Sequence, residues 1–235
     1  MADLSSFPIT KRWPASNPDI IQLYSLPTPN GVKVSIALEE LGLAYEPHLV
    51  SFSTNDQKSP EFLSLNPNGR IPAIIDPIGP DGKPIGLFES GAILVYLAEK
   101  TGKLMPGDAA GRYETLEWVF FQMAGIGPMF GQFGHFFKFA AEKVANNSYP
   151  VERYRDEGKR LLGVLEERLK GRQWIMGDEY TIADITTFPW VRGVDVFYGG
   201  RELLEFESFP SVMAWLERAL ARPASQRGLS IPKRD

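Results

Sequence analysis

The chain passes from a short apolar strand into an amphipathic helix at Tyr24-Ser25-Leu26-Pro27-Thr28-Pro29-Asn30-Gly31. Apolar residues follow at positions i, i+3, i+4 and i+7, so we expect a helix that begins near Asn30 and ends at Gly42. The first turn of such a helix presents free N–H groups, and its peptide dipoles favour an anion near Thr28. Because a thiolate is such an anion, this turn is predicted to hold a sulfur.

Residues 20 to 102 alternate strand-like and helix-like patterns in the order βαβ, short helix, ββα. A strand, a helix and a strand form a right-handed crossover with parallel strands. The two later strands are joined by a turn at 81–84, so they form a hairpin added to that pair. The expected strands cover 20–24, 45–52, 70–76 and 85–88, and the expected helices begin near Asn30, Pro60 (capped by Ser59) and Glu89.

The second half of the chain has helical patterns throughout. The Thr181-Ile182-Ala183-Asp184 stretch is typical of a capping box, with Asp184 where Glu or Gln is usual, and Pro189 should kink the helix that follows. A kink or break is expected at 125–128. The expected helices cover 112–123, 129–144, 152–170, a stretch from Thr181 past Trp190, and 210–220.

Changes of composition divide the chain into domains and connections. Proline-punctuated residues without periodicity at 1–19 predict an extended arm, and a compositional break at 104–111 predicts a linker. The division is therefore an arm at 1–19, a first domain at 20–103, a linker at 104–111, a helical domain at 112–223 and a tail at 224–235.

The composition excludes several classes of function. A chain of 235 residues with 43% hydrophobic content can build one large or two modest domains. Its net charge of -4 gives no broad attraction to nucleic acid or to an anionic membrane. No run approaches the roughly 18 apolar residues of a spanning helix, and no signal-peptide core is present. We expect a cytoplasmic protein with neither nucleic acid nor membrane as a partner.

The chain has no cysteine, and its only histidines are His48 and His135. Disulfides, thiolate metal ligands and a cysteine nucleophile are therefore absent, and a histidine-rich metal site or triad is poorly supplied. No metal site is expected. If this protein performs thiol chemistry, its ligands bring the thiols.

Several motifs, taken in their order, resemble those of the cytosolic glutathione S-transferases. These motifs are Thr28-Pro29-Asn30-Gly31, Arg70-Ile71-Pro72, Phe88-Glu89-Ser90-Gly91-Ala92-Ile93 and Thr181-Ile182-Ala183-Asp184, within a resemblance that covers roughly Ile20 to Pro223. The turn and the Glu-Ser motif look most like the nu class, whose members are glutathione-dependent disulfide-bond reductases. The resemblance implies an α+β thioredoxin-like N-terminal domain followed by an all-α C-terminal domain, a homodimer, and a cis peptide bond before Pro72.

Glutathione reacts as its thiolate, so the protein must lower the pKa of the thiol. A free thiol titrates near pH ~8.5, and little thiolate exists at neutrality. Lowering that pKa by two units requires about 2.7 kcal/mol, which one hydroxyl hydrogen bond and a helix N-terminus could supply. Thr28 is the expected hydroxyl donor, and Asn30 could donate a second N–H. The alternatives are that Thr28 only starts the turn, that Asn30 only caps the helix, and that Ser25 is the hydroxyl.

The γ-glutamyl and glycyl ends of glutathione are charged, and its cysteinyl unit has backbone groups that need hydrogen-bond partners. Glu89 would bind the ammonium of the γ-glutamyl unit, and the Ser90 hydroxyl and N–H its carboxylate, although an ordinary N-cap explains the pair equally well. Ile71, held before Pro72, would pair its backbone with the cysteinyl unit as an added strand does. The glycine carboxylate has Gln57 and Arg70 as candidate partners, and the resemblance adds Arg153, which could also be a solvated helix arginine.

A second substrate needs a pocket of its own. Apolar and aromatic residues of the helical half could form its walls, although such a stripe is more often core: Met129, Phe130, His135, Phe136 and Phe137. The leading hypothesis is disulfide exchange with a small disulfide, using one or two glutathiones per subunit. The alternatives are conjugation of glutathione to electrophiles and a glutathione-binding regulatory protein with little turnover.

Overall fold

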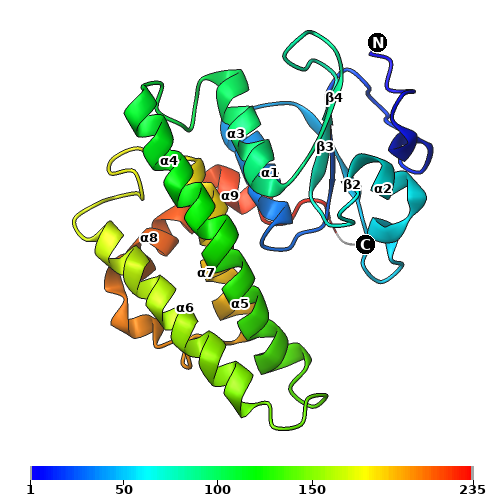
Figure 1. The fold of residues 1–235 in the computed structure, drawn as a ribbon. Helices are drawn as coiled ribbons and strands as arrows, with labels where there is room; N and C mark the ends of the chain where they lie inside the picture. The colour runs from blue at the N-terminus through cyan, green and yellow to red at the C-terminus, as the bar shows by residue number, and fades with distance from the viewer. Residues whose placement is uncertain (1, 234–235) are drawn as a thin grey trace. The chain divides into compact units, whose positions relative to one another are not determined.

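The computed structural model describes residues 2–233, and the chain divides into two compact units. The first unit comprises the chain up to Gly102 together with the chain from Pro223 onward, and the second is Lys103–Arg222 (Figure 1). The C-terminal end therefore returns to the first unit, whereas the sequence predicted a separate polar tail.

A four-stranded mixed sheet, in the order β2-β1-β3-β4, organises the first unit. β1 (Ile21–Ser25) pairs in parallel with β2 (Tyr45–Leu49) and antiparallel with β3 (Ala73–Asp76). β4 (Ile85–Phe88) completes the hairpin with β3. The predicted crossover with an added hairpin is confirmed, and with it the thioredoxin-like fold.

Helices cover both faces of this sheet. α1 (Gly31–Leu41) and α3 (Ser90–Thr101) lie on one face, and α2 (Pro60–Leu65) lies on the other (Figure 1). α1 ends at Gly42, whose φ of 64° is the left-handed conformation that glycine adopts at helix ends. Ser59 caps α2 as predicted, because its hydroxyl oxygen accepts a backbone N–H from the first turn.

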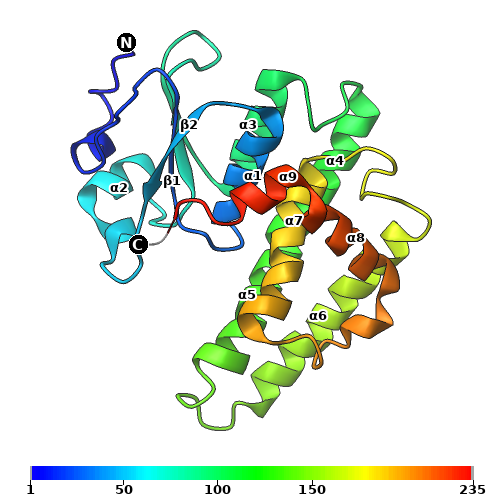
Figure 2. The same cartoon turned by 180° about the vertical axis from the view of Figure 1, so that it is seen from behind.

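The C-terminal residues add a helix that the sequence did not predict. α9 (Pro223–Gly228) packs against α1, as Figure 2 shows from behind. The Ser35 hydroxyl donates to the Gly228 carbonyl oxygen at 2.7 Å. Pro223 is the first residue of α9, a position that proline favours because its missing N–H has no partner inside the helix there.

The N-terminal segment, residues 2–19, also differs from its prediction as an extended arm. It contains the 3-10 turn η1 (Pro8–Lys11), and the Leu4 and Ile9 side chains are buried in one core cluster with Phe62. Phe7 and Trp13 pack against the same cluster. The apolar side chains of this polar-looking segment therefore make it part of the first unit.

The second unit is helical, as predicted. α4 (Ala109–Phe121) does not break near residue 125 but continues through the π-turn η3 (Gln122–Ile126) into α5 (Gly127–Gly134). Pro128 lacks an N–H for a regular helical bond, so the wider turn accommodates it. A second π-turn, η4 (His135–Phe139), ends the rod earlier than the predicted residue 144.

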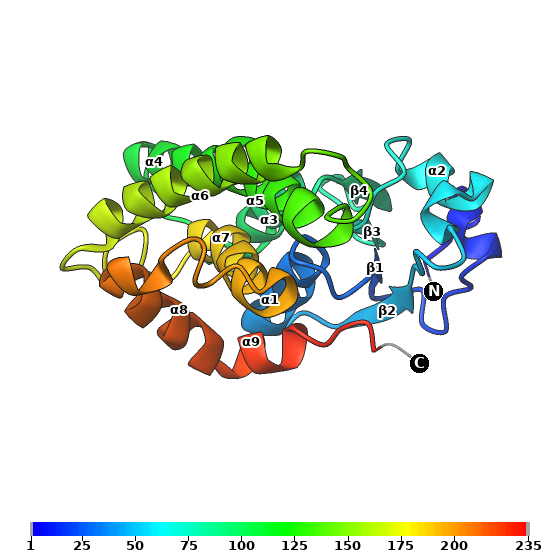
Figure 3. The same cartoon turned by 90° about the horizontal axis from the view of Figure 1, so that it is seen from below.

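α7 (Ile182–Gly193) contacts α4 and α8 (Pro210–Ala221), and in Figure 3 it lies between them. α6 (Ser148–Leu169) packs against α5 and α8. Arg168 of α6 contacts α4 by donating to Glu114 Oε1 at 2.5 Å, and its guanidinium lies 5.0 Å from the centre of the Trp118 ring. The second unit also contains the turns η5 (Val194–Tyr198) and η6 (Phe206–Ser208), whereas the turn η2 (Asp56–Lys58) belongs to the first unit.

The N–H groups at the start of α7 are bonded by side chains and by the Leu104 carbonyl oxygen, all within its own unit. Thr181 Oγ1 accepts the Ala183 N–H at 3.2 Å, and Asp184 Oδ2 accepts the Thr181 N–H at 3.0 Å. Asp184 Oδ1 accepts the Ile175 N–H at 2.9 Å and the Trp215 indole N–H at 2.8 Å. Burial raises the pKa of Asp184 to about 6 despite these bonds. The predicted capping box, with Asp184 in place of Glu or Gln, is confirmed.

None of the helices in residues 2–233 is both long enough and apolar enough to span a membrane.

Candidate functional site

The loops predicted to bind a ligand meet at one end of the sheet. β1 and β2 end there together, because the parallel register pairs Ser25 with Leu49. β3 starts at the same end, because Tyr24 pairs with Ala73, and β4 ends there, because Ala73 also pairs with Phe88. The loops at this edge carry Thr28, Gln57, Ile71 and Glu89.

Thr28 is half-buried in the turn between β1 and α1. Its N–H donates to the Leu26 carbonyl oxygen at 2.7 Å, and its own carbonyl accepts the Val32 N–H at 3.0 Å. Thr28 Oγ1 accepts the Gly31 N–H at 3.4 Å, a contact that uses only acceptor capacity of the hydroxyl. The hydroxyl can therefore start the turn and still donate its hydrogen to an anion. Ser25, the competing hydroxyl, is completely buried.

Glycine at position 31 allows this turn to close. A Cβ at Gly31 would lie 1.9 Å from the Leu26 carbonyl oxygen and 2.6 Å from Ser25 Oγ, so a larger residue would displace the turn. Asn30 occupies the N-cap position of α1 in helical φ/ψ, and its side chain makes no capping hydrogen bond. The alternative role of Asn30 as a side-chain cap is therefore not observed.

Glu89 and Ser90 form a strained entry to α3. Glu89 has φ 69° and ψ 113°, a backbone conformation that costs about 1–3 kcal/mol for a residue with a side chain and that clusters at functional sites. The Glu89 side chain is exposed and makes no capping bond, whereas Ser90 is buried. The structure thus presents Glu89 outward at the sheet edge where the sequence placed the ammonium partner.

Lys33 is the residue beside this site that sequence reasoning missed. It is completely buried in α1, and its Nζ donates to Ser90 Oγ at 3.3 Å. Burial lowers the pKa of Lys33 well below its usual value, while the negative charge of Glu89 raises it. The available signal was a lysine between two valines on a helix whose surrounding positions are apolar.

The segment before β3 has the shape that the resemblance implied. The peptide bond between Ile71 and Pro72 is cis, and the Ile71 side chain is buried. Asn66 Nδ2 donates to the Arg70 carbonyl oxygen at 2.5 Å, while the Arg70 side chain is exposed. The burial of Ile71 agrees with a role in which only its backbone contacts a ligand.

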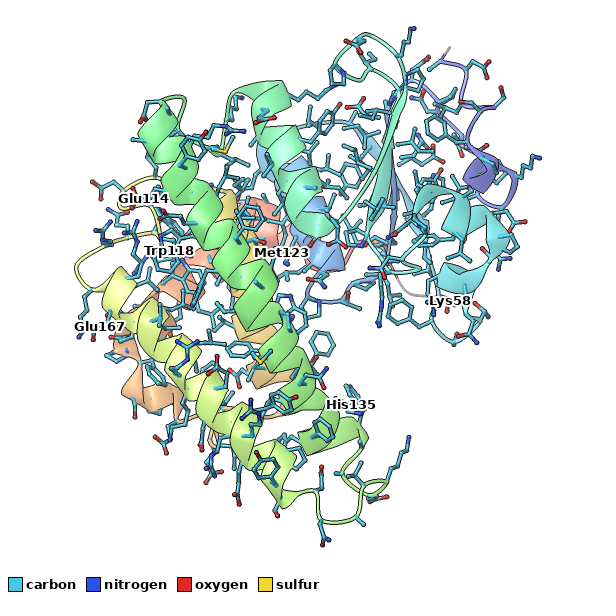
Figure 4. All side chains as sticks on the ribbon, in the orientation of Figure 1. Lys58, Glu114, Trp118, Met123, His135 and Glu167 are labelled. Atoms are coloured by element: carbon cyan, nitrogen blue, oxygen red, sulfur yellow. The ribbon has the colours of Figure 1, made fainter. Side chains whose placement is uncertain are left out.

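Gln57 lies in η2 against the same segment. A Cβ added at Gly69 would lie 3.1 Å from the Gln57 carbonyl oxygen and 2.7 Å from Lys58 Nζ, whose side chain Figure 4 labels. Gln57 Oε1 is buried and has no hydrogen-bond partner in the described part of the chain. An unsatisfied buried amide oxygen is costly, so a ligand N–H at this position would be stabilising.

The other predicted site residues belong to the second unit. Arg153 is exposed on α6, His135 is exposed at the start of η4 (Figure 4), and Met129 and Phe136 are half-buried. Phe130 is completely buried, so it is core and not a pocket wall. The prediction is wrong for Phe130 because its side chain faces the interior of the unit.

Within residues 2–233, we find no group of three or more histidine, aspartate or glutamate side chains arranged to hold a metal ion.

Comparison with known proteins places these features in a family context. Residues 20–99 match the model of the glutathione S-transferase N-terminal domain, and residues 123–223 match that of the C-terminal domain. The disulfide-bond oxidoreductase YfcG of Escherichia coli strain K12 is 43% identical over 211 residues, which are 89% of this chain and 94% of YfcG.

Two solved structures are similar over nearly their whole length. A glutathione transferase from Burkholderia graminis, with two glutathione molecules bound per subunit, is 65% identical with a TM-score of 0.96, covering 100% of this chain and 98% of that one. A glutathione transferase from Pseudomonas putida, with one glutathione disulfide bound per subunit, is 60% identical with a TM-score of 0.95, covering 98% and 99%.

Proposed function

This chain belongs to the glutathione S-transferase family, and we propose that it is a glutathione-dependent disulfide-bond reductase of the nu class. The main support for the proposal is that the loops at one end of the strands carry Thr28, Gln57, Ile71 and Glu89, in a chain that has no cysteine. Its relative YfcG is a disulfide-bond oxidoreductase, and the Pseudomonas putida relative holds a glutathione disulfide. Both thiols of an exchange reaction would then come from glutathione.

The site would hold the first glutathione by its charged ends and its backbone. Glu89 pairs with the ammonium, and the start of α3 at Ser90 receives the γ-glutamyl carboxylate. The Ile71 backbone pairs with the cysteinyl unit, and Gln57 and Arg70 bind the glycyl end. Arg153 is a further candidate partner for glutathione. These contacts bring the sulfur to Thr28 and Asn30 at the start of α1.

Thr28 then has the role of stabilising the thiolate. Its hydroxyl donates to the sulfur, and the dipole of α1 favours the negative charge, so the thiol loses its proton more readily at neutral pH. The thiolate attacks one sulfur of a disulfide, forming a mixed disulfide and releasing the other sulfur as a thiolate that takes up a proton. No cysteine of the protein takes part.

A second glutathione completes the reaction. Its thiolate attacks the glutathione sulfur of the mixed disulfide, which releases the second substrate thiol and leaves glutathione disulfide. Two glutathiones are oxidised to one disulfide, and one substrate disulfide is reduced to two thiols, so electrons and protons balance. We expect two glutathione sites per subunit, as in the Burkholderia graminis relative, and calorimetric stoichiometry measures their number.

We also propose a cytoplasmic homodimer. Tyr113 and Phe120 are 64% and 67% exposed and lie two turns apart, hence on one face of α4. Exposed aromatic side chains that share one face are typical of a surface that a second subunit covers. The cytoplasm is the compartment whose reduced glutathione the reaction consumes. Light scattering should give twice the mass of one chain.

The experiment compares two acceptors and two variants. Wild type, Thr28→Ala and Thr101→Ala are assayed side by side with a small glutathione-mixed disulfide and with a chloronitrobenzene. Thr101 is a matched control, because it is a half-buried threonine at the far end of α3 whose hydroxyl donates to Leu97. We expect Thr28→Ala to lower kcat/KM for the disulfide by about 10- to 100-fold, the range of one hydrogen bond to a charged group.

The outcomes separate the candidate functions. Conjugation that is fast while disulfide reduction is absent would make the protein a conjugating transferase. Glutathione binding with neither activity would make it a regulatory protein. Equal disulfide reduction by wild type and Thr28→Ala would remove Thr28 from its role, and the ultraviolet absorbance of bound thiolate against pH checks the same role directly.

A further inference from the structure

The N-terminal segment, residues 2–19, lies before the part of the chain that matches the family model, which begins at residue 20. It is nevertheless anchored in the first unit. Leu4 and Ile9 lie in the core cluster, and the backbone N–H groups of Ser16 and Asn17 donate to the two carboxylate oxygens of Glu46 at 2.9 and 3.0 Å. The segment is therefore held near its beginning, middle and end.

Two neighbouring residues of this segment contact the two ends of one loop. The Trp13 indole N–H donates to the carbonyl oxygen of Leu49, the last residue of β2, at 3.0 Å. Arg12 Nη2 donates to Asp56 Oδ1 at 2.5 Å, and the guanidinium lies 5.2 Å from the centre of the Trp13 ring. The loop between these two contacts leaves the sheet at the edge that gathers the candidate site.

Asp56 connects this contact to the site, because it directly precedes Gln57. Its Oδ2 accepts the Ser51 N–H at 3.0 Å, and its own N–H donates to the Ser51 carbonyl oxygen at 3.0 Å. Burial alone would raise the pKa of Asp56. The hydrogen bonds with Ser51, Thr54 and Arg12 and the charge of Arg12 outweigh burial, so the pKa lies below its usual value. Asp56 is thus a charged tie that closes the loop and joins it to Arg12.

We propose that residues 2–19 are a positioning element of the glutathione site, in which Arg12 and Trp13 hold the two ends of the loop that directly precedes Gln57. The inference rests on the function proposed above. Arg12 does not touch the ligand in this arrangement; it acts through Asp56 on the place of the Gln57 side chain, whose buried Oε1 has no partner of its own in the described chain. A ligand group bound by Gln57 therefore depends on an arginine outside the family domain.

The test removes the charge of Arg12 without removing the segment. Wild type, Arg12→Gln and Arg12→Lys are compared in affinity for glutathione by calorimetry and in kcat and KM. Hydrogen exchange of residues 51–59 reports on the loop itself. Arg160→Gln is the control, because Arg160 makes a 2.7 Å ion pair with Glu157 on α6 and is 58% exposed, against 42% for Arg12.

We expect Arg12→Gln to weaken glutathione binding and raise KM about fivefold, the effect of one half-exposed ion pair. Its kcat should stay within about twofold of wild type, because no group at the sulfur changes. Exchange at 51–59 should be faster, and Arg12→Lys should recover most of the affinity. Arg160→Gln should match wild type in every measurement.

Two results would overturn the inference in different ways. Unchanged glutathione affinity in Arg12→Gln, together with a lower melting temperature, would make the ion pair a structural contact only. A wild-type protein that binds no glutathione would remove the proposed function and this inference together. Because the wild-type titration is independent of the variants, the two failures are distinguishable.

Discussion

Two helix starts in this molecule differ in how their free backbone N–H groups are bonded. One is the start of α7 in the second unit, and the other is the start of α1 in the first unit. At α7, Thr181 and Asp184 form a capping box whose carboxylate also binds the Trp215 indole. At α1, Asn30 occupies the cap position without a capping bond, and the Gly31 N–H has only a long 3.4 Å contact to Thr28 Oγ1. The start of α3 at Glu89 likewise has no side-chain cap.

Burial explains the difference. Asp184 and Thr181 are 0% and 1% exposed, so neither water nor a ligand can bond the start of α7, and the chain must do so itself. Thr28 and Asn30 are only half-buried, so an incoming anion can reach the start of α1. A helix start that its own side chains bond only weakly, at the end of the strands where the ligand-binding loops meet, is thus the more informative of the two.

We expect the largest loss of stability when the hydrogen bonds at the buried start of α7 are removed. Asp184→Ala leaves the N–H groups of Ile175, Thr181 and Trp215 without their acceptor. We expect a loss of about 3–5 kcal/mol in the free energy of unfolding, because each buried donor left unsatisfied costs about 1–3 kcal/mol. Urea unfolding measures it, with Asp156→Ala, an exposed aspartate on the same unit, as control. A loss under about 1 kcal/mol would contradict the comparison.

Two serines at helix starts of the first unit allow the same comparison, because Ser59 caps α2 and Ser90 begins α3. Ser59→Ala removes the cap of α2 and should cost about 1 kcal/mol of stability while leaving glutathione affinity unchanged. Ser90→Ala, at the start of α3, should instead weaken glutathione binding about tenfold, the equivalent of one hydrogen bond to a carboxylate. If both variants lose only stability, the start of α3 is an ordinary structural start and not a ligand site.

The smallest expected effect is on the pH dependence of stability, and it comes from His48, a buried titratable residue in β2. His48 stacks on Tyr24 at 4.8 Å, its Nε2 lies 2.8 Å from Gln22 Oε1, and burial lowers its pKa. Below its unfolded pKa of about 6.5, the unfolded chain binds more protons at this position than the folded one, so acidification lowers stability. Asp184 has the opposite sign, because its raised pKa favours the protonated folded state.

Urea unfolding of wild type and His48→Gln at about pH 7.5 and about pH 5.5 isolates the histidine contribution. Wild type should lose more stability than His48→Gln between the two conditions. Identical losses would show that His48 titrates alike in the folded and unfolded states, and the contrast with Asp184 would then not hold.

Local patterns predicted a large part of this structure. The apolar spacing and Gly42 predicted α1, Ser59 predicted the start of α2, and Thr181 with Asp184 predicted the start of α7. Each of these signals operates within about one helical turn, so no distant partner is needed to interpret it. The anion-favouring turn at Thr28 was predictable for the same reason, whereas the other site residues came from the resemblance of short motifs to those of a known family.

The predictions that failed depended on distant contacts. Whether residues 2–19 form an arm or pack depends on whether Leu4 and Ile9 find a core, which Phe62 and β3 provide. The burial of Phe130 depends on which face of α5 meets its neighbours. The role of α9 depends on the surface of α1 that receives it. None of these partners is near in sequence.

The sequence by itself determined the order of the elements and their caps, because these follow from short-range spacing and turn chemistry, while the loops that could hold glutathione were indicated by the resemblance of their motifs to a known family. Only the tertiary structure decided that Lys33 lies buried against Ser90 and that Arg12 reaches Asp56. Burial and ion pairing join residues 57 and 44 positions apart, and such distances are set by how strands and helices pack.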